Sequence, residues 1–185
     1  MSLYKLNVSE LREGLSKGAF SPKDILDDCI KRIESIDTTL NAFPIRCFDK
    51  AYEQVRKLPS VKNIDFKEYP LFGIPVGVKD LNDIQGVRTT QGSHLYENYI
   101  PEQDDNIVSS MRYNGALFPG KTNVPEHGFG ATTFNELFGT TNNPYDITKS
   151  CGASSGGTAV SIASHMVPLA MGSDFAGSLR TPASF

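Results

Sequence analysis

The chain has 185 residues, of which 39% are hydrophobic and 21% are charged, and its formal net charge is −3. This composition is typical of an ordinary globular protein and excludes a disordered chain or a bundle of membrane-spanning helices. A small negative charge without a Lys/Arg cluster argues against direct binding to nucleic acid. Cys29, Cys47 and Cys151 are widely spaced, which predicts neither a disulfide framework nor a Cys-x-x-Cys metal site and fits a reducing cytoplasm.

The N-terminal part of the chain carries helix signals. Ser21 and Pro22, followed by apolar residues at three- to four-residue spacing, predict an amphipathic helix over residues 22–36. Two more helices are predicted over residues 9–17 and 49–58, because a glycine and a proline end the respective patterns. We therefore expect residues 1–60 to be helical.

The rest of the chain alternates between strand and helix signals. Residues 71–78 are apolar at every second position on both faces, which predicts a buried strand that leads directly to Lys79. Further helices are predicted over residues 106–113 and 156–165, and further strands over residues 116–118 and 167–171. This alternation predicts an α/β fold.

The length and element pattern favour a single domain over residues 1–185, with a helical region at 1–60 and a core at 70–185. Residues 120–149 are rich in Gly, Thr, Asn and Pro, and a long ordered loop of this kind is often functional. No apolar stretch reaches the length of a membrane span, and the N-terminus lacks the features of a signal peptide.

Two serines stand in glycine-rich segments. Ser154 lies in Gly-Ala-Ser-Ser-Gly-Gly, and Ser178 lies in Asp-Phe-Ala-Gly-Ser-Leu-Arg. Lys79 lies upstream, in Gly-Val-Lys-Asp. A serine hydroxyl needs a neighbouring base to become a nucleophile, and a lysine can be that base when burial lowers its pKa. Two hydroxyls and one amine are therefore sufficient for nucleophilic catalysis.

These motifs, together with Gly-Lys-Thr-Asn at 120–123, resemble the amidase signature family of amide hydrolases. The resemblance spans nearly all of residues 72–185 and marks the chain as the N-terminal portion of such a domain. It implies a mixed β-sheet covered by helices, incomplete in this chain. It also implies a serine acyl-enzyme and no metal or organic cofactor.

The resemblance assigns a role to each motif. It implies that Ser178 is the nucleophile, Ser154 a bridging serine with a cis peptide bond, and Lys79 the base. The expected oxyanion donors are the backbone N–H groups of Phe175, Ala176, Gly177 and Ser178. The residues expected to support the site are Ser155, Asp174 and Arg180.

The expected substrate is a small-molecule amide, which is cleaved to an acid and ammonia or an amine. Two alternatives stay open: a glutaminase of the type found in the A subunit of glutamyl-tRNA amidotransferase, and a non-catalytic binding or assembly module. Membrane partners are not expected, whereas a homo-oligomer or an amidotransferase partner subunit is compatible with the sequence. Because the chain stops soon after Ser178, we expect a folded or partly folded fragment that shows little turnover alone.

Other interpretations of single residues are weaker. The Gly-x-Ser-x-Gly spacing around Ser154 also fits the nucleophile elbow of α/β-hydrolases, but that motif needs a strand directly before it and residues 143–150 have the composition of a turn. A phosphate-binding loop would need Gly-Lys-Ser/Thr after the glycines. His94, His127 and His165 lack metal-ligand spacing, so surface or packing roles are expected for them.

Overall fold

The computed structural model describes residues 2–185 and contains a four-stranded sheet with the strand order β1-β3-β2-β6. Strand β2 pairs in parallel with β3 and β6, whereas β1 pairs antiparallel with β3. Strands β4 and β5 form a separate antiparallel pair. The predicted α/β class with a mixed sheet is confirmed. The strands are β1 (Ile45–Arg46), β2 (Val76–Lys79), β3 (Gly120–Thr122), β4 (Phe134–Asn135), β5 (Gly139–Thr140) and β6 (Leu169–Met171).

All five predicted helices are present. A capping box formed by Ser21 and Asp24 begins α2, and Asn41 in the left-handed conformation ends it, so this helix is longer than predicted. A short α6 and four 3₁₀ turns complete the helical elements of the described residues. The α-helices are α1 (Val8–Ser16), α2 (Pro22–Leu40), α3 (Phe48–Lys57), α4 (Asn106–Tyr113), α5 (Gly156–Ala163) and α6 (Arg180–Ala183), and the 3₁₀ turns are η1 (Leu3–Lys5), η2 (Val61–Asn63), η3 (His94–Tyr96) and η4 (Glu126–Gly128).

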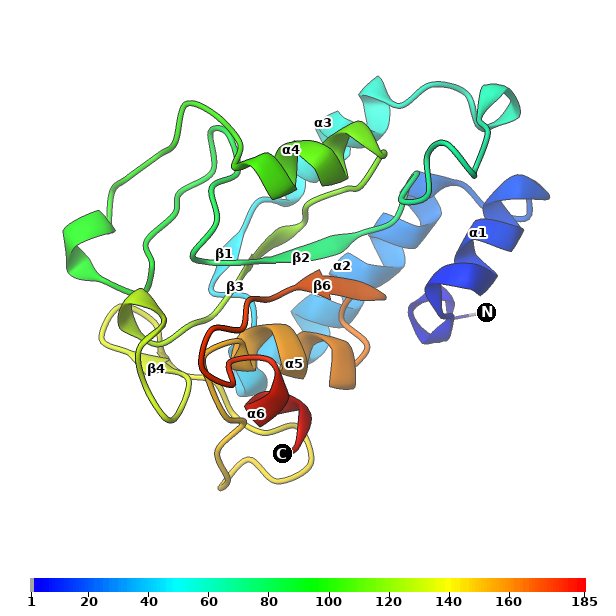
Figure 1. Ribbon diagram of the computed structural model, residues 1–185. Coiled ribbons are helices and arrows are strands. Elements are labelled where there is room, and N and C mark those ends of the chain that lie inside the picture. The colour runs from blue at the N-terminus through cyan, green and yellow to red at the C-terminus, as the bar shows by residue number, and fades with distance from the viewer. Residues whose placement is uncertain (1) are drawn as a thin grey trace.

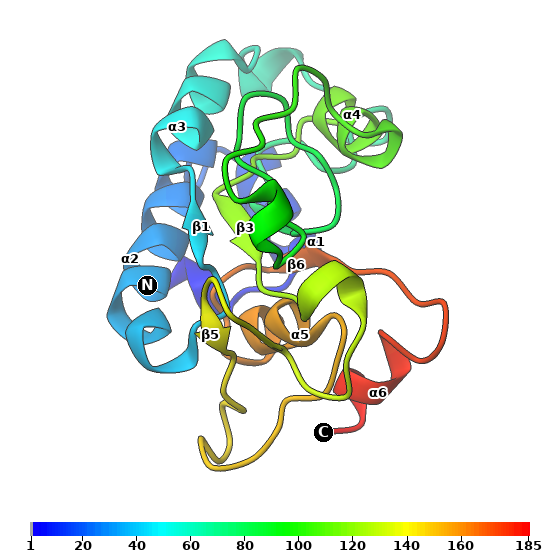
Figure 2. The ribbon, with the colours of Figure 1, turned by 90° about the vertical axis from the view of Figure 1, so that its left-hand side faces the viewer.

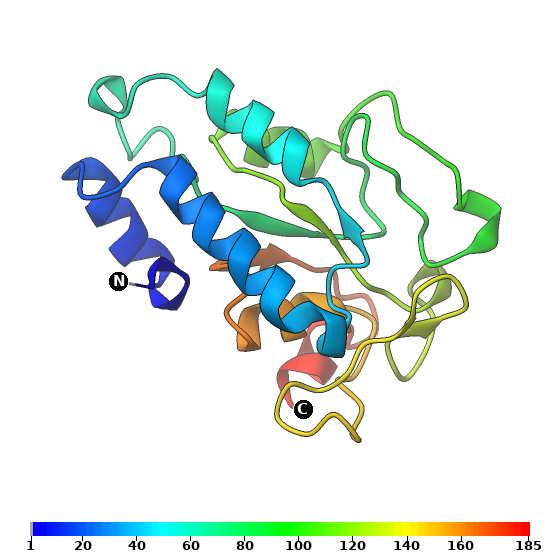
Figure 3. The same ribbon diagram turned by 180° about the vertical axis from the view of Figure 1, so that it is seen from behind.

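Helices cover the sheet on more than one side. Helices α4 and α5 lie on opposite sides of β2 in Figure 1, and α2 runs across the back of the molecule in Figure 3. Ile33 of α2, Val160 of α5 and Phe43 belong to one buried apolar cluster, and Val76 and Val78 of β2 belong to another together with Val108 of α4. The sheet is thereby held between two apolar layers.

Several strand predictions were wrong in detail. The strand predicted at 116–118 begins instead at Gly120, and Leu117 forms only an isolated bridge with Pro75. Proline has no N–H, so the ladder is irregular at this point. The strand predicted at 71–78 covers only Val76–Lys79, because Gly73 adopts a left-handed turn conformation. Residues 1–60 also contain β1, which is too short to produce a periodic pattern.

The register of β2 directs neighbouring side chains to opposite faces. Successive residues of a strand point to opposite sides of the sheet. Lys79 points toward the segment that precedes α5, where it contacts Ser154, whereas Asp80 forms an ion pair with Lys121 of β3. The end of β2 therefore presents an amine to one layer and a carboxylate to the other.

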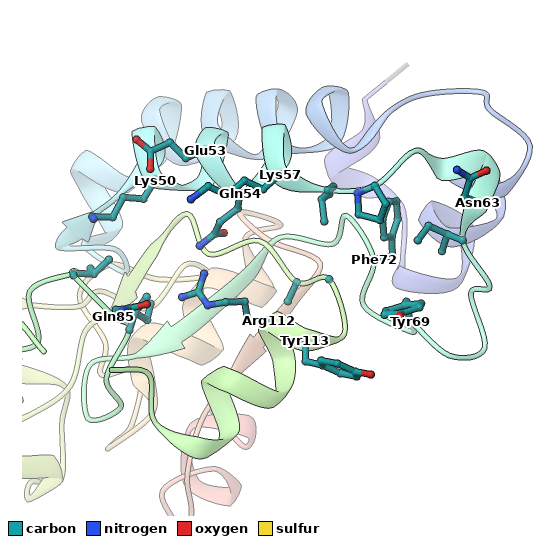
Figure 4. A pocket seen from close by; sticks show the side chains of 18 residues that line it. Lys50, Glu53, Gln54, Lys57, Asn63, Tyr69, Phe72, Gln85, Arg112 and Tyr113 are labelled. Atoms are coloured by element: carbon teal, nitrogen blue, oxygen red, sulfur yellow. The ribbon is translucent and has the colours of Figure 1, made fainter. Parts of the chain in front are cut away.

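One large groove lies away from these motifs. It has a volume of about 810 Å³ and is lined by residues of α3, of the turn at 84–87 and of the end of α4. Figure 4 shows the side chains of Gln54 and Arg112 pointing into it from α3 and α4. None of the residues predicted for the catalytic site lines this groove.

Candidate active site

Lys79 ends β2, and its side chain is completely buried. Its Nζ atom lies 2.8 Å from Ser154 Oγ, 2.8 Å from Ser155 Oγ and 3.0 Å from Ser173 Oγ. An ammonium group has three N–H donors, so three hydroxyl oxygens satisfy it fully. When the amine is neutral it keeps two donors and one lone pair, and the lone pair can accept a proton from one of the same hydroxyls.

Burial lowers the pKa of Lys79 to about 8, because the ammonium form loses its hydration inside the protein. The carboxylate of Asp174 acts in the opposite direction and raises this pKa. A group that titrates close to neutral pH can take up and release a proton during a reaction cycle. The environment of Lys79 thus fits the role predicted for it.

Ser154 and Ser155 stand directly before α5, and the peptide bond between Ala153 and Ser154 is cis. The start of α5 lies very close to the end of β3. A Cβ atom on Gly157 would lie 2.4 Å from the backbone nitrogen of Asn123, so a larger residue has no room there. The glycine run therefore allows the close approach that brings both serines to Lys79.

The second motif forms an exposed loop between β6 and α6, and Figure 2 shows α6 beside α5. Asp174 organises this loop by accepting hydrogen bonds from the guanidinium group of Arg180, at 3.0 and 2.8 Å, and from three backbone N–H groups. The Arg180 side chain, followed by the N–H of Gly177, holds the pKa of Asp174 well below its usual range. Asp174 and Arg180 thus fix the loop that carries Ser178.

The two serine segments are joined through the backbone. The N–H of Ser155 donates a hydrogen bond of 3.1 Å to the carbonyl oxygen of Ser178. Ser178 itself is half-buried, and within residues 2–185 no hydrogen bond joins its hydroxyl to that of Ser154. The structure therefore brings Lys79, Ser154 and Ser155 into direct contact and places Ser178 on the adjoining loop.

The predicted oxyanion donors differ in their availability. The N–H of Gly177 donates to Asp174 Oδ1 at 2.8 Å. The N–H groups of Phe175, Ala176 and Ser178 have no hydrogen-bond partner in the described part of the chain. Gly177 has φ = 102°, a conformation that glycine adopts without steric cost. The neighbouring Ala176 does not have a positive φ, so its side chain does not meet that cost.

Sequence reasoning missed Ser173 as a contact of Lys79. Its hydroxyl lies 3.0 Å from Nζ, and its N–H donates to Ser155 Oγ at 3.3 Å. Ser173 stands in the same Gly-Ser-Asp segment as Asp174, so its position one residue before Asp174 was the available signal. Cys151 beside the first motif is buried, and burial raises the pKa of its thiol, which fits a packing role.

Neither a metal site nor a membrane span is found in the part of the chain that the structure describes. Among residues 2–185, His, Cys, Asp and Glu side chains form no group of three that could hold a metal ion. The longest helix among these residues is too polar to cross a bilayer.

A buried lysine in contact with serine hydroxyls, on a mixed sheet between helices, defines an α/β protein with a serine–lysine site. A family model described as Amidase matches residues 24–185. The chain belongs to the amidase signature family, as its motifs predicted.

Individual relatives agree with this assignment. The chain is 34% identical over its whole length to the A subunit of glutamyl-tRNA(Gln) amidotransferase from Persephonella marina. It superimposes on 6-aminohexanoate cyclic dimer hydrolase with a TM-score of 0.90 and 30% identity, covering 100% of this chain and 37% of that one. The corresponding amidotransferase protein of Thermotoga maritima has a TM-score of 0.75 and 31% identity, with the same coverage. The chain spans 38% of the length of the Persephonella protein, so it corresponds to part of a longer fold.

Proposed function

We propose that the protein containing this chain hydrolyses a carboxylic amide through a serine acyl-enzyme. The observation that carries the proposal is the 2.8 Å contact between Lys79 Nζ and Ser154 Oγ at a fully buried position. Family membership supports amide hydrolysis as the reaction class.

In the proposed first step, Ser178 Oγ attacks the amide carbonyl carbon. Its proton passes to Ser154, and the proton of Ser154 passes to Lys79. The negative charge that develops on the carbonyl oxygen is stabilised by the free backbone N–H groups of the 175–178 loop. This step requires neutral Lys79, and its lowered pKa of about 8 makes the neutral form accessible at a lower pH than for an ordinary lysine.

In the second step the C–N bond breaks. The leaving nitrogen takes up the proton that returns from Lys79 through Ser154, and the acyl group stays on Ser178 Oγ. A water molecule then attacks the ester carbonyl carbon and gives a proton to the same relay. The bond between the acyl carbon and Ser178 Oγ breaks, Ser178 Oγ takes the proton back from the relay, and the carboxylic acid is released. Ser155 and Ser173 hold Lys79 in place throughout, because their hydroxyls accept the N–H groups that do not face Ser154.

The activated serine can be tested with a fluorophosphonate and intact-mass measurement on the full-length protein. We expect one adduct that is absent from the Ser178→Ala and Lys79→Ala variants. Both substitutions lower amide hydrolysis by more than about 10⁴-fold, because the members of such a relay act as a unit. A Ser178→Ala variant that retains full turnover would contradict the proposal and favour a non-catalytic binding module.

A second candidate function is the release of ammonia from glutamine for a partner protein. It is favoured by the relatives that are named as the A subunit of glutamyl-tRNA(Gln) amidotransferase, at 34 to 37% identity. Ammonia release from glutamine, increased by a co-purified protein, would distinguish this function from the hydrolysis of other amides. Equal turnover of several unrelated amides without a partner would contradict it.

A further inference from the structure

Two non-glycine residues in the left-handed conformation contact each other near the candidate site. Gln91 has φ = 53° and His127 has φ = 51°. The N–H of His127 donates a 2.7 Å hydrogen bond to the carbonyl oxygen of Gln91, and their side chains approach to 3.4 Å between Nδ1 and Oε1. Residues with side chains adopt this conformation rarely, and they keep it only where their surroundings hold them.

This contact leads directly to Ser154. Gly128 follows His127, and a Cβ atom on Gly128 would lie 3.6 Å from Ser154 Oγ and 2.9 Å from the side chain of Leu81. The backbone of Gly128 is therefore part of the wall beside the Ser154 hydroxyl. Any displacement of His127 would move this wall.

Further contacts join the same two segments. Ser93, which is buried, donates its hydroxyl to Glu126 Oε1 at 2.7 Å. The ring of Tyr96 packs edge-on against the ring of His127, with 6.0 Å between their centroids. Residues 91–96 thus contact η4 through two hydrogen-bonded pairs and one aromatic pair.

The turn that carries Gln91 is anchored to the buried ion pair at the end of β2. The N–H and the hydroxyl of Thr90 both donate to the carboxylate of Asp80, and the N–H of Gln91 donates to the carbonyl oxygen of Asp80 at 3.1 Å. Lys121 Nζ lies 2.9 Å from the same carboxylate and 2.6 Å from Thr89 Oγ1. Because Asp80 directly follows Lys79 in the chain, the end of β2 positions both the Lys79 amine and the turn that carries Gln91.

We propose that Gln91 is a positioning residue that holds His127 and Gly128 beside Ser154 and thereby shapes the wall that the substrate contacts. This inference rests on the proposed function, because it names a residue that shapes that site. Gln91 does not touch the proton relay; it acts through the left-handed backbone that presents its carbonyl oxygen to His127.

The test uses three variants of the full-length protein. Gln91→Val places a β-branched residue where the left-handed conformation disfavours it, whereas Gln91→Gly keeps that conformation without the side chain. His165→Val is the matched control, because His165 is also left-handed, with φ = 56°, but is exposed at the end of α5.

Hydrogen exchange of the backbone N–H groups of residues 126–130 measures, independently of turnover, whether Gln91 holds this segment in place. We expect faster exchange there in Gln91→Val, and near-normal exchange in Gln91→Gly and His165→Val. We also expect Gln91→Val to raise KM for an amide by about tenfold, because the wall is displaced. The rate of Ser178 phosphonylation by a small fluorophosphonate should change little, since the relay stays intact.

Unchanged exchange at residues 126–130 in Gln91→Val overturns the inference. An equal increase of exchange at these residues in His165→Val also overturns it, because it would indicate general destabilisation. Gln91→Gly as impaired as Gln91→Val would also overturn the backbone role. If the unmodified protein forms no fluorophosphonate adduct, the proposed function fails. The exchange result still decides whether Gln91 holds His127 and Gly128 in place.

Discussion

At the scale of single residues, Lys79 determines how the proposed reaction depends on pH. Its pKa is lowered to about 8 by burial, so below pH 8 the amine carries a proton and has no lone pair for Ser154. Above pH 8 the amine is neutral and can act as the base. We therefore expect kcat/KM to rise with pH and to level off above about pH 8.

The measurement is kcat/KM for one amide substrate over a range of pH in the full-length protein. A rise of kcat/KM centred near pH 10.5, the ordinary pKa of lysine, would show that Lys79 is hydrated during catalysis and would contradict this prediction. Lys79→Arg is the control. Its guanidinium group stays protonated over the whole pH range, so we expect kcat/KM of this variant not to rise with pH.

The site residues predicted from the sequence stand in recognisable local motifs, whereas the contacts that were not predicted depend on the tertiary fold. Ser154 and Ser178 stand in glycine-containing segments, and Lys79 ends an apolar strand. Ser173 stands between Gly172 and Asp174 in one of these segments, but its contact with Lys79 joins residues 94 positions apart in the chain, which the segment alone does not reveal. Gln91 and His127 are likewise brought together only by the tertiary fold.

At the scale of elements, β2 and β3 are joined by a buried ion pair as well as by their ladder. Asp80 is 1% exposed and Lys121 is fully buried, and burial lowers the pKa of Lys121. Removing one partner leaves the other charge buried without compensation. We therefore expect Lys121→Met to lower the free energy of unfolding by about 3–5 kcal/mol.

Urea unfolding followed by circular dichroism measures this change. The double variant Asp80→Asn with Lys121→Met removes both charges, so we expect it to be less destabilised than Lys121→Met alone. Lys62→Met, at an exposed position, is the control for loss of a lysine. A Lys121→Met variant as stable as this control would contradict the role assigned to the pair.

Helices were predicted better than strands, for a physical reason. A helix such as α2 shows a cap and a repeating apolar face within its own sequence. Strand β3 has the polar sequence Gly-Lys-Thr and is nevertheless buried, because Lys121 pairs with Asp80 and Thr122 hydrogen-bonds Thr158 of α5. Its polarity is compensated by partners that lie far away in the sequence, so no local pattern could locate this strand.

At the scale of the whole molecule, the end of the sheet beside Ser178 is open. Phe175 is fully exposed, and Leu179 and Phe185 are 41% and 57% exposed, so an apolar surface surrounds the loop that carries Ser178. The chain spans 38% of the length of its Persephonella relative, and among residues 2–185 strand β6 pairs on one side only, with β2. We infer that further chain or a partner covers this surface in the working protein.

This inference predicts a difference between residues 1–185 alone and the full-length protein. Lys79 and Ser154 are already in contact within residues 1–185, whereas the Ser178 loop is exposed on one side. We expect the short form to react with a fluorophosphonate at least about tenfold more slowly, because the loop is not held in its reactive geometry. The short form should also bind a dye specific for exposed apolar surface, and the full-length protein should not. Equal labelling rates would show that residues 1–185 are sufficient to activate Ser178, and would restrict the role of the remaining chain to binding the substrate.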